Sequence, residues 1–278
     1  MSLSINGSSS SGLNAMSQSQ RALQLAMARL ASGQRITSGA DDPAGLIIAK
    51  QLEAMLSGMD QASANTDAAV SLLQTADGGL EQTQGILAQQ RTLALQAANS
   101  ATMDDQQLAA INTQYQALNQ ALDLVASSTT FAKKPLLDGS FTKQSMQIGA
   151  SAGDTVSVDI ASTVTGSSAG YSSHGLGLSG LDISNTSDAL ARLDAASSAV
   201  GQQRGTLGAL QANALESNAR SLAIGRENLA SAISTIADAD IAQEAAALTS
   251  NQIKLQSGIA MQAQAHQHAG RVLQLLGM

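Results

Sequence analysis

Few side chains in this sequence are of types that carry out chemistry. Its 278 residues include three histidines, His174, His266 and His268, and no cysteine. The absence of cysteine excludes disulfides, thiolate metal sites and cysteine nucleophiles. His266 and His268 are two positions apart, and residues at that spacing do not face each other on a helix. The histidines therefore predict no metal site.

Catalytic motifs are also missing from the sequence. It contains no H-E-x-x-H zinc motif, no glycine-rich phosphate loop after a strand, and no recognisable serine, histidine and aspartate set. We therefore predict that the chain is not an enzyme. We expect no catalytic, cofactor-binding or metal residues, no cofactor and no small-molecule substrate.

The composition excludes further classes of protein. Apolar residues make up 44% of the chain, charged residues 13% and aromatic residues 1%, and the net charge is -7. An acidic chain is not expected to bind nucleic acid, which requires a basic face. The longest apolar runs, such as residues 44–49, are far shorter than the roughly 18 residues of a membrane span. The first positive side chain is Arg21, so we expect no cleavable secretory signal.

Apolar residues recur alternately three and four positions apart in five stretches: 13–30, 48–80, 108–125, 215–236 and 241–276. This spacing predicts helices packed along narrow seams, as in coiled coils. Asp42 before Pro43 predicts a helix start, with the aspartate as N-cap. Residues 185–188 offer similar caps before a helix around Leu190. From Pro43 to about Asn99 only the pair Gly78 and Gly79 weakens the helical pattern.

The length of the second helix predicts the shape. A helix from Pro43 to Asn99 would be about 85 Å long at ~1.5 Å per residue. A compact globule of this size would be roughly 50 Å across. We therefore predict a mainly α fold, an elongated rod of long antiparallel coiled-coil-like helices formed by both chain ends.

The middle of the chain has a different pattern. Residues 145–148 and 155–160 alternate polar and apolar side chains, with a glycine-containing turn between them, which predicts a small β-hairpin. Residues 165–180 are rich in glycine and serine and predict an exposed loop. The expected order is helices, hairpin, loop and helices.

Such helices bury little apolar area, because many seam positions hold alanine, threonine or glutamine. Burial contributes only about 25 cal/mol per Å². We expect an isolated chain to leave apolar stripes uncovered, most of all at its two ends, and such stripes mark association sites. The sequence therefore predicts a protein that associates with copies of itself.

Several segments resemble bacterial flagellin, the subunit of the flagellar filament. Residues 29–45, R-L-A-S-G-Q-R-I-T-S-G-A-D-D-P-A-G, are similar to the family's R-L-S-S-G-x-R-I-N-S-A-x-D-D-A-A-G. Residues 146–160, M-Q-I-G-A-S-A-G-D-T-V-S-V-D-I, resemble its hairpin. Residues 74–80, 93–100, 233–244 and 264–276 resemble further stretches. The similarity runs over nearly the whole chain.

The resemblance implies a subunit that self-polymerises into the helical filament used for motility. It implies inner-core terminal helices at 1–40 and 241–278. A helical outer-core domain is implied at 41–165 and 186–240, with the β-hairpin near 145–160. Residues 166–185 would be an exposed loop in place of variable outer domains. The implied partners are copies of the chain or sister flagellins, an export chaperone, and the cap and hook-junction proteins. The implied location is the extracellular filament, reached through the flagellar type III pathway without a cleaved signal peptide.

The resemblance also implies a set of polymerisation contacts. They lie on the family motif and on the terminal helices: Leu23, Met27, Arg29, Leu30, Arg35, Asp41, Asp42, Leu255, Ile259, Val272, Leu273, Leu275 and Leu276. For the charged residues of the motif, a solvated, capped turn is the simpler alternative. For the last four residues, the alternative is a frayed amphipathic end.

A surface for the vertebrate innate flagellin receptor is implied at Gln89, Arg91, Leu93 and Gln114. The recognised family members carry arginine and glutamate where this chain has Gln89 and Gln114. Because charged anchors make the stronger hydrogen bonds, we expect weak receptor activation. The alternative is that these residues face a neighbouring subunit.

Two other functions are open at this point. The hook-filament junction protein shares both terminal patterns, and cellular abundance would separate it from a filament subunit. A secreted membrane-active helical translocator is an alternative from a different class. Membrane-surface helices usually carry basic residues on one face and tryptophan or phenylalanine on the other, whereas this chain has two phenylalanines and no tryptophan.

Overall fold

The computed structural model describes residues 5–99, 103–161, 164, 170–183 and 185–275. The chain divides into two compact units. The terminal unit comprises residues 1–56 and 227–278, and the central unit comprises residues 57–226. Helices α2 (Pro43–Ala97) and α5 (Glu216–Ala237) contribute residues to both units.

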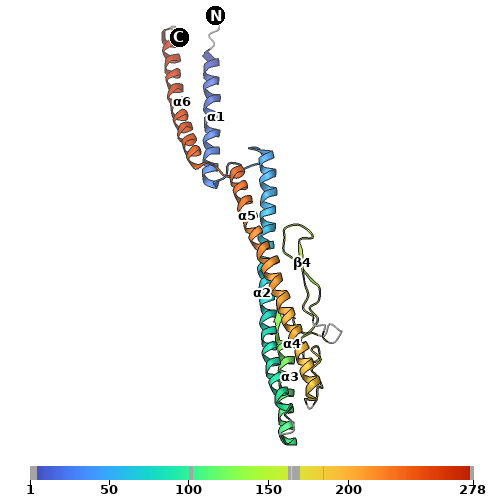
Figure 1. Ribbon diagram of the computed structural model, residues 1–278. Helices are drawn as coiled ribbons and strands as arrows, with labels where there is room; N and C mark the ends of the chain where they lie inside the picture. The colour runs from blue at the N-terminus through green and yellow to red at the C-terminus, as the bar shows by residue number, and fades with distance from the viewer. Residues whose placement is uncertain (1–4, 100–102, 162–163, 165–169, 184, 276–278) are drawn as a thin grey trace. The chain divides into compact units, whose positions relative to one another are not determined.

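The terminal unit is built on α1 (Ile5–Ser32) and α6 (Ile241–Leu275), which lie side by side (Figure 1). Met16 lies opposite Gly258 near one end of the pair, and Arg29 lies opposite Glu244 near the other. The two helices therefore run antiparallel, as predicted for the two chain ends. An isolated antiparallel β-bridge pairs Gln34, which follows α1, with Asp238, which follows α5.

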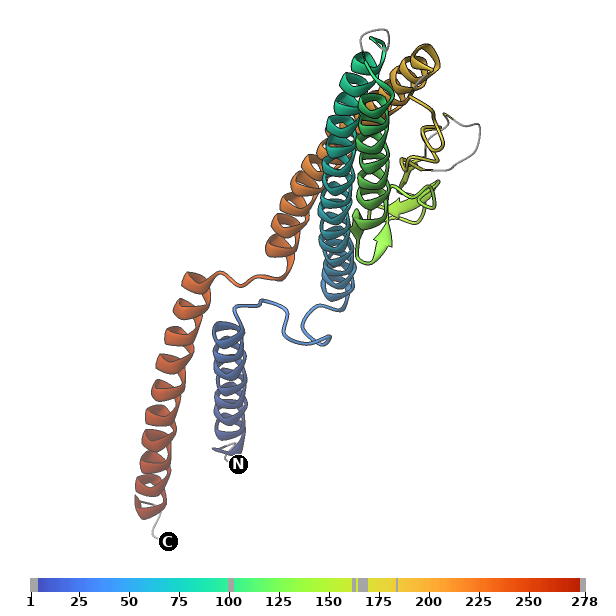
Figure 2. The same ribbon diagram turned by 90° about the horizontal axis from the view of Figure 1, so that it is seen from below.

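The central unit packs the remaining part of α2 against α3 (Asp105–Ser128) and α4 (Thr186–Ala209), and Figures 1 and 2 both show α2 and α3 side by side. Between α4 and α5 lies η2 (Leu210–Leu215), one turn of π-helix. Asp104 begins α3 with a capping box, because its side chain and that of Gln107 each accept the other residue's amide. The predicted cap at Asn185 differs: α4 begins after it, but its side chain makes no capping hydrogen bond.

The predicted hairpin is confirmed as β3 (Gln144–Gln147) paired antiparallel with β4 (Thr155–Val158). Val158 and Ile160 are buried against the helices, and Met146, Ile148 and Val156 are half-buried. A second hairpin was not predicted: β1 (Thr130–Phe131) pairs with β2 (Lys134–Pro135) through a tight turn.

Residues 170–183 lie in the segment predicted to be an exposed loop, and the structure differs there. They form no helix or strand, yet Tyr171, Leu176, Leu178 and Ile183 are fully buried in the central core. Tyr171 donates a backbone hydrogen bond to the Leu137 carbonyl, which fixes the segment against the preceding loop. Glycine and serine content predicted an exposed segment, but four large apolar side chains are buried and anchor it.

The predicted long helix is confirmed, since α2 runs from Pro43 to Ala97 without a break at Gly78 and Gly79. Asp42 accepts a hydrogen bond from the Gly45 amide at 2.9 Å, so it is the N-cap that the sequence predicted. The core of the central unit is mostly leucine and alanine, with Tyr115 and Tyr171 as its largest buried side chains.

Candidate self-association surfaces

The terminal unit exposes large apolar side chains along both of its paired helices. Met261 keeps 69% of its surface exposed and Ile253 keeps 59%. Among the residues whose burial the structure describes, Leu13, Leu25, Met27, Ile241 and Ile259 on α1 and α6 are also exposed. A largely apolar groove of about 470 Å³ also opens between α1 and α6, beside Met16, Gly258 and Met261. Apolar surface of this extent is typical of a helix pair that packs against further protein.

The predicted apolar contacts divide into two groups. Leu23, Leu30 and Leu255 are half-buried, whereas Met27 and Ile259 are exposed. Both groups include residues of α1 and residues of α6. The side chains of Val272, Leu273 and Leu275 and the whole of Leu276 lie outside the described residues.

Arg29 and Glu244 join the two terminal helices. The Arg29 Nη1 donates to Glu244 Oε1 at 3.0 Å, and the two side chains are 24% and 14% exposed. A charge-assisted hydrogen bond in a partly buried position is stronger than an exposed ion pair. Arg29 therefore holds α1 against α6 at the end of the pair where α1 ends and α6 begins.

Arg35 ties the two connections of the terminal unit to each other. Its Nη2 donates to the Ile236 carbonyl at 2.6 Å, and its amide donates to the Ala237 carbonyl at 2.7 Å. It also lies 3.8 Å from Asp42. The predicted motif residue therefore crosslinks the backbone that follows α1 to the backbone that ends α5.

Asp41 organises the turn before α2. Its Oδ2 accepts hydrogen bonds from the amides and hydroxyls of Thr37 and Ser38, at 2.9 to 3.2 Å. The Thr37 hydroxyl, followed by the Ser38 amide, holds the pKa of this carboxyl below its ordinary value. Within the chain, Asp41 and Asp42 thus form a capped turn, the simpler of the two predicted readings.

The structure brings together three of the four residues predicted for the receptor surface. Gln89, Leu93 and Gln114 line one groove of about 480 Å³ between α2 and α3. Arg91 lies on another face of α2, where it pairs with Asp194 of α4 at 3.2 Å. The sequence alone did not separate these two faces.

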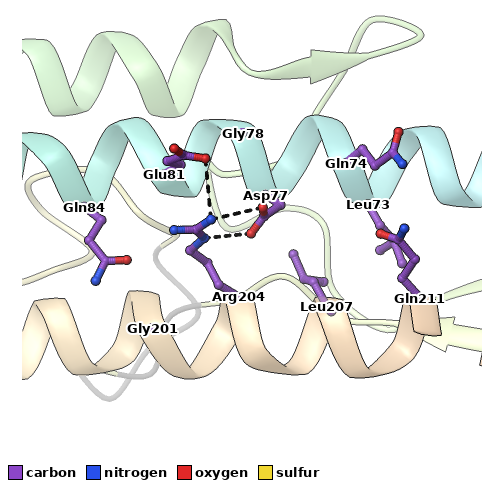
Figure 3. A pocket seen from close by; sticks show the side chains of 11 residues that line it. Leu73, Gln74, Asp77, Gly78, Glu81, Gln84, Gly201, Arg204, Leu207 and Gln211 are labelled. Atoms are coloured by element: carbon purple, nitrogen blue, oxygen red, sulfur yellow. Dashed lines mark hydrogen bonds and ion pairs between the residues drawn. The ribbon is translucent and has the colours of Figure 1, made fainter. Parts of the chain in front are cut away.

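A second groove of the central unit, about 570 Å³, lies between α2 and α4 (Figure 3). Arg204 projects from α4 across it to Asp77 and Glu81 of α2. Gly78 and Gly201 face open space there. Sequence analysis missed this cluster, although Arg204 is a charged residue between the buried Val200 and Leu207, which indicates a partner on the facing helix.

The three histidines lie apart from such clusters. His174 is exposed beside Ser179, and His266 contacts Gln262 on α6. In the part of the chain that the structure describes, no group of three histidine, aspartate or glutamate side chains is placed to hold a metal ion. Among the same residues, no helix combines the length and apolar character needed to cross a membrane.

Long antiparallel helices with an alanine-rich core and exposed apolar side chains define a helical structural protein of the kind that assembles with other copies. The model for the bacterial flagellin N-terminal helical region matches residues 3–142, and that for the C-terminal helical region matches residues 190–276. The chain belongs to the bacterial flagellin family, a family of structural proteins. It is a subunit of the extracellular flagellar filament, as predicted.

Individual relatives agree with this placement. The chain is 37% identical to a flagellin of Halalkalibacterium halodurans, with 91% of each chain covered. It is 35% identical to a flagellin of Bacillus subtilis, covering 95% of this chain and 96% of that one. It is 36% identical to the flagellar filament 30.7 kDa core protein of Treponema maltophilum, covering 89% and 90%. A crystal structure of Bacillus cereus flagellin aligns with 57% of this chain and 88% of that chain, at 25% identity and a TM-score of 0.48.

Proposed function

We propose that the chain polymerises through the exposed apolar side chains of α1 and α6. The observation that carries this proposal is the exposure of Ile253, Ile259 and Met261 on α6, together with Leu13 and Met27 on α1. Burying such side chains between copies stabilises a polymer by about 1.5–3 kcal/mol for each fully buried one. Many copies in register multiply that contribution along the filament.

In this proposal, residues 1–40 and 241–278 form the inner core of the filament. Residues 41–165 and 186–240 form the outer core, and residues 166–185 take the place of variable outer domains. Arg29, Arg35, Asp41 and Asp42 support contacts indirectly, because each holds the terminal helices and their connections in place within one copy. The proposed contacts also include Val272, Leu273, Leu275 and Leu276, whose side chains lie outside the described residues.

The proposed partners outside the polymer follow from family membership. An export chaperone would cover the exposed apolar side chains of the terminal helices before assembly, since an amphipathic helix is commonly held in a partner's groove. The cap and the hook-junction proteins would contact the filament at its two ends, and sister flagellins would be able to co-assemble. Export through the flagellar type III pathway, without a cleaved signal peptide, belongs to the same proposal.

Seeded polymerisation tests the main proposal. Purified monomer would be mixed with short filament seeds at neutral pH and imaged by negative-stain electron microscopy. We expect long uniform tubes from the full chain and none from residues 41–240 alone. The variant I253D/I259D should fail to elongate seeds, because it places charges at two exposed apolar positions of α6. Gln256→Asp is the matched control on an exposed position of the same helix.

Two outcomes would contradict the proposal. Normal elongation by I253D/I259D would show that these exposed side chains are not polymer contacts. Monomer that stays soluble with every seed would favour the junction protein or the membrane-active translocator, which liposome co-sedimentation then tests.

The receptor proposal is weak activation of the vertebrate innate flagellin receptor. Its support is the α2–α3 groove, which presents the uncharged Gln89 and Gln114 beside Leu93, while Arg91 is paired with Asp194. The variant Q89R/Q114E should raise the response of a receptor reporter cell to purified monomer. A full response to the unaltered chain would contradict the proposal.

A further inference from the structure

The helix pair of the terminal unit and its two connections carry opposite charges. Helices α1 and α6 contain one acidic residue, Glu244, and four basic residues: Arg21, Arg29, Lys254 and Arg271. The connections, residues 33–42 and 238–240, contain one basic residue, Arg35, and four acidic residues: Asp41, Asp42, Asp238 and Asp240. The whole chain has a net charge of -7 at pH 7. The helix pair is therefore basic within an acidic chain.

Only part of this charge is paired within one copy. Arg29 binds Glu244, and Arg35 lies 3.8 Å from Asp42. Over the described part of the helix pair and its connections, the charged residues left without an ion pair are all exposed: Arg21, Lys254 and Arg271 on the helices, and Asp41, Asp238 and Asp240 on the connections. The unpaired cations and the unpaired carboxylates are thus equal in number.

Two of the cations form a basic band across the helix pair. Arg21 comes five residues after Met16 on α1, and Lys254 comes four residues before Gly258 on α6. Met16 lies opposite Gly258, and the two helices are antiparallel, so Arg21 and Lys254 lie at nearly the same level. We call these two residues the basic band.

Two of the carboxylates are held at the end of the pair where α1 ends and α6 begins. The Ala239 amide donates to the Gly33 carbonyl at 2.9 Å, and Asp238 forms a β-bridge with the other connection. Asp240 accepts the Gln243 amide at 3.1 Å in the first turn of α6. We call Asp238 and Asp240 the acidic connection. It lies about 20 Å along the helix axis from the basic band, at ~1.5 Å per residue.

The basic band belongs to the surface that exposes apolar side chains. Leu25 is exposed four residues after Arg21, so the two share a face of α1. Lys254 lines the groove between α1 and α6 together with Gly258 and Met261. A copy that covers these apolar side chains therefore brings its own atoms close to both cations.

Charge decides what apolar contact leaves open. Burial of apolar side chains is non-directional, so it does not fix the position of one copy along another. Parallel copies without an offset would place basic band beside basic band, and like charges oppose that arrangement. An offset of about 20 Å instead places the basic band of one copy beside the acidic connection of the next. Such a contact joins two different patches, and repeating it builds an open filament when it does not close into a ring.

We propose that the basic band, Arg21 and Lys254, docks on the acidic connection, Asp238 and Asp240, of a second copy that is offset along the helix axis. The apolar side chains supply the attraction, and the opposite charges set the offset. A second copy is the occupant because it carries the matching carboxylates at a fixed place. This inference rests on the proposed polymerisation.

Charge reversal in the full chain tests the contact. K254E and D238K should each slow seed elongation about tenfold, because each replaces an attraction with a repulsion. The variant K254E/D238K exchanges the two charges and should elongate within about threefold of the unaltered chain. Because the two positions lie about 20 Å apart in one copy, this recovery cannot come from a contact within that copy.

The control for net charge is Arg220→Glu, at an exposed position of α5. It changes the net charge as K254E does and should elongate normally. R220E/D238K has the same net charge as K254E/D238K and should stay as slow as D238K. Recovery in R220E/D238K would show that only net charge matters and would overturn the contact.

Two further results would also overturn it. One is normal elongation by K254E and D238K, which would leave the basic band for an anionic partner other than a second copy. The other is slow elongation by both single variants without recovery in K254E/D238K. The neutral variants K254Q and D238N disturb the monomer least and should each slow elongation about threefold. Normal elongation by both would overturn the contact even where a reversed variant misfolds.

These results are distinct from failure of the proposed function. Failure of the unaltered chain to elongate seeds would overturn the polymerisation proposal and, with it, the basis of this contact. Normal elongation by the unaltered chain and by every charge variant would overturn the offset contact alone.

Discussion

Arg204 on α4 binds Asp77 on α2 through two parallel hydrogen bonds, from Nε to Oδ1 at 2.7 Å and from Nη2 to Oδ2 at 3.2 Å. The guanidinium also lies 3.5 Å from Glu81. The hydrogen bond that Arg204 donates to Asp77 raises the pKa of Arg204 above its ordinary value. This fork fixes the rotation of α4 against α2 before the π-turn.

Replacing Arg204 by alanine should therefore destabilise the central unit. We expect the free energy of unfolding to fall by about 1 kcal/mol, since the pair is bidentate but a third exposed. Arg204→Lys should recover only part of the loss, because lysine cannot form the fork. Urea unfolding followed by circular dichroism measures the change. Arg220→Ala, an exposed arginine of α5, is the control, and an equal loss there would contradict a specific contact.

The adjacent Gly78 and Gly79 should respond to alanine in opposite directions. A Cβ on Gly79 would lie 2.7 Å from both Leu137 Cδ1 and Thr129 Oγ1, whereas one on Gly78 would meet nothing within 4 Å. Gly79→Ala should destabilise the fold by about 1–3 kcal/mol through overpacking. Gly78→Ala should stabilise it by about 1 kcal/mol through helix propensity. Thermal unfolding of the two variants side by side gives the answer, and shifts of the same sign would refute the close approach at Gly79.

The turn between β1 and β2 should accept a stabilising substitution. Ala132 and Lys133 adopt positive φ angles of 48° and 68°, which asparagine and glycine tolerate better in a two-residue hairpin turn. We expect A132N/K133G to raise the free energy of unfolding by about 0.5–1 kcal/mol. The control is Lys134→Gly in strand β2, which should lower it. Chemical denaturation measures both, and a loss of stability in the turn variant would contradict the assigned backbone.

The two tyrosines should make stability depend on alkaline pH. Burial raises the pKa of Tyr115 to about 12 and raises that of Tyr171 as well. In the unfolded chain a tyrosine ionises at about pH 10, so the folded state binds the phenol protons more tightly. The resulting contribution to the free energy of unfolding is complete below about pH 10. It is lost as the pH rises toward the pKa that the tyrosines have in the folded state.

Absorbance of tyrosinate, followed together with helical circular dichroism, tests this dependence without interference because the chain has no tryptophan. We expect phenolate to form only as the helices unfold. The control is the same titration in denaturant, where the tyrosines should ionise with a midpoint at about pH 10. Phenolate forming at that pH while the helices persist would show that the tyrosines are accessible.

The sequence by itself determined the local structure. The repeat of apolar residues predicted the helices, Asp42 and Pro43 predicted the start of α2, and strict alternation predicted the pairing of β3 with β4. These features depend on neighbours close in the chain, where spacing alone decides which side chains share a face. The family motifs at both ends added the functional placement.

Only the tertiary structure decided which distant residues meet. Arg204 reaches Asp77 across 127 positions, and Arg29 reaches Glu244 across 215. Arg91 lies on a different face of α2 from Gln89 and pairs there with Asp194 of α4. Residues 170–183 are anchored by buried apolar side chains, which their glycine and serine content did not predict.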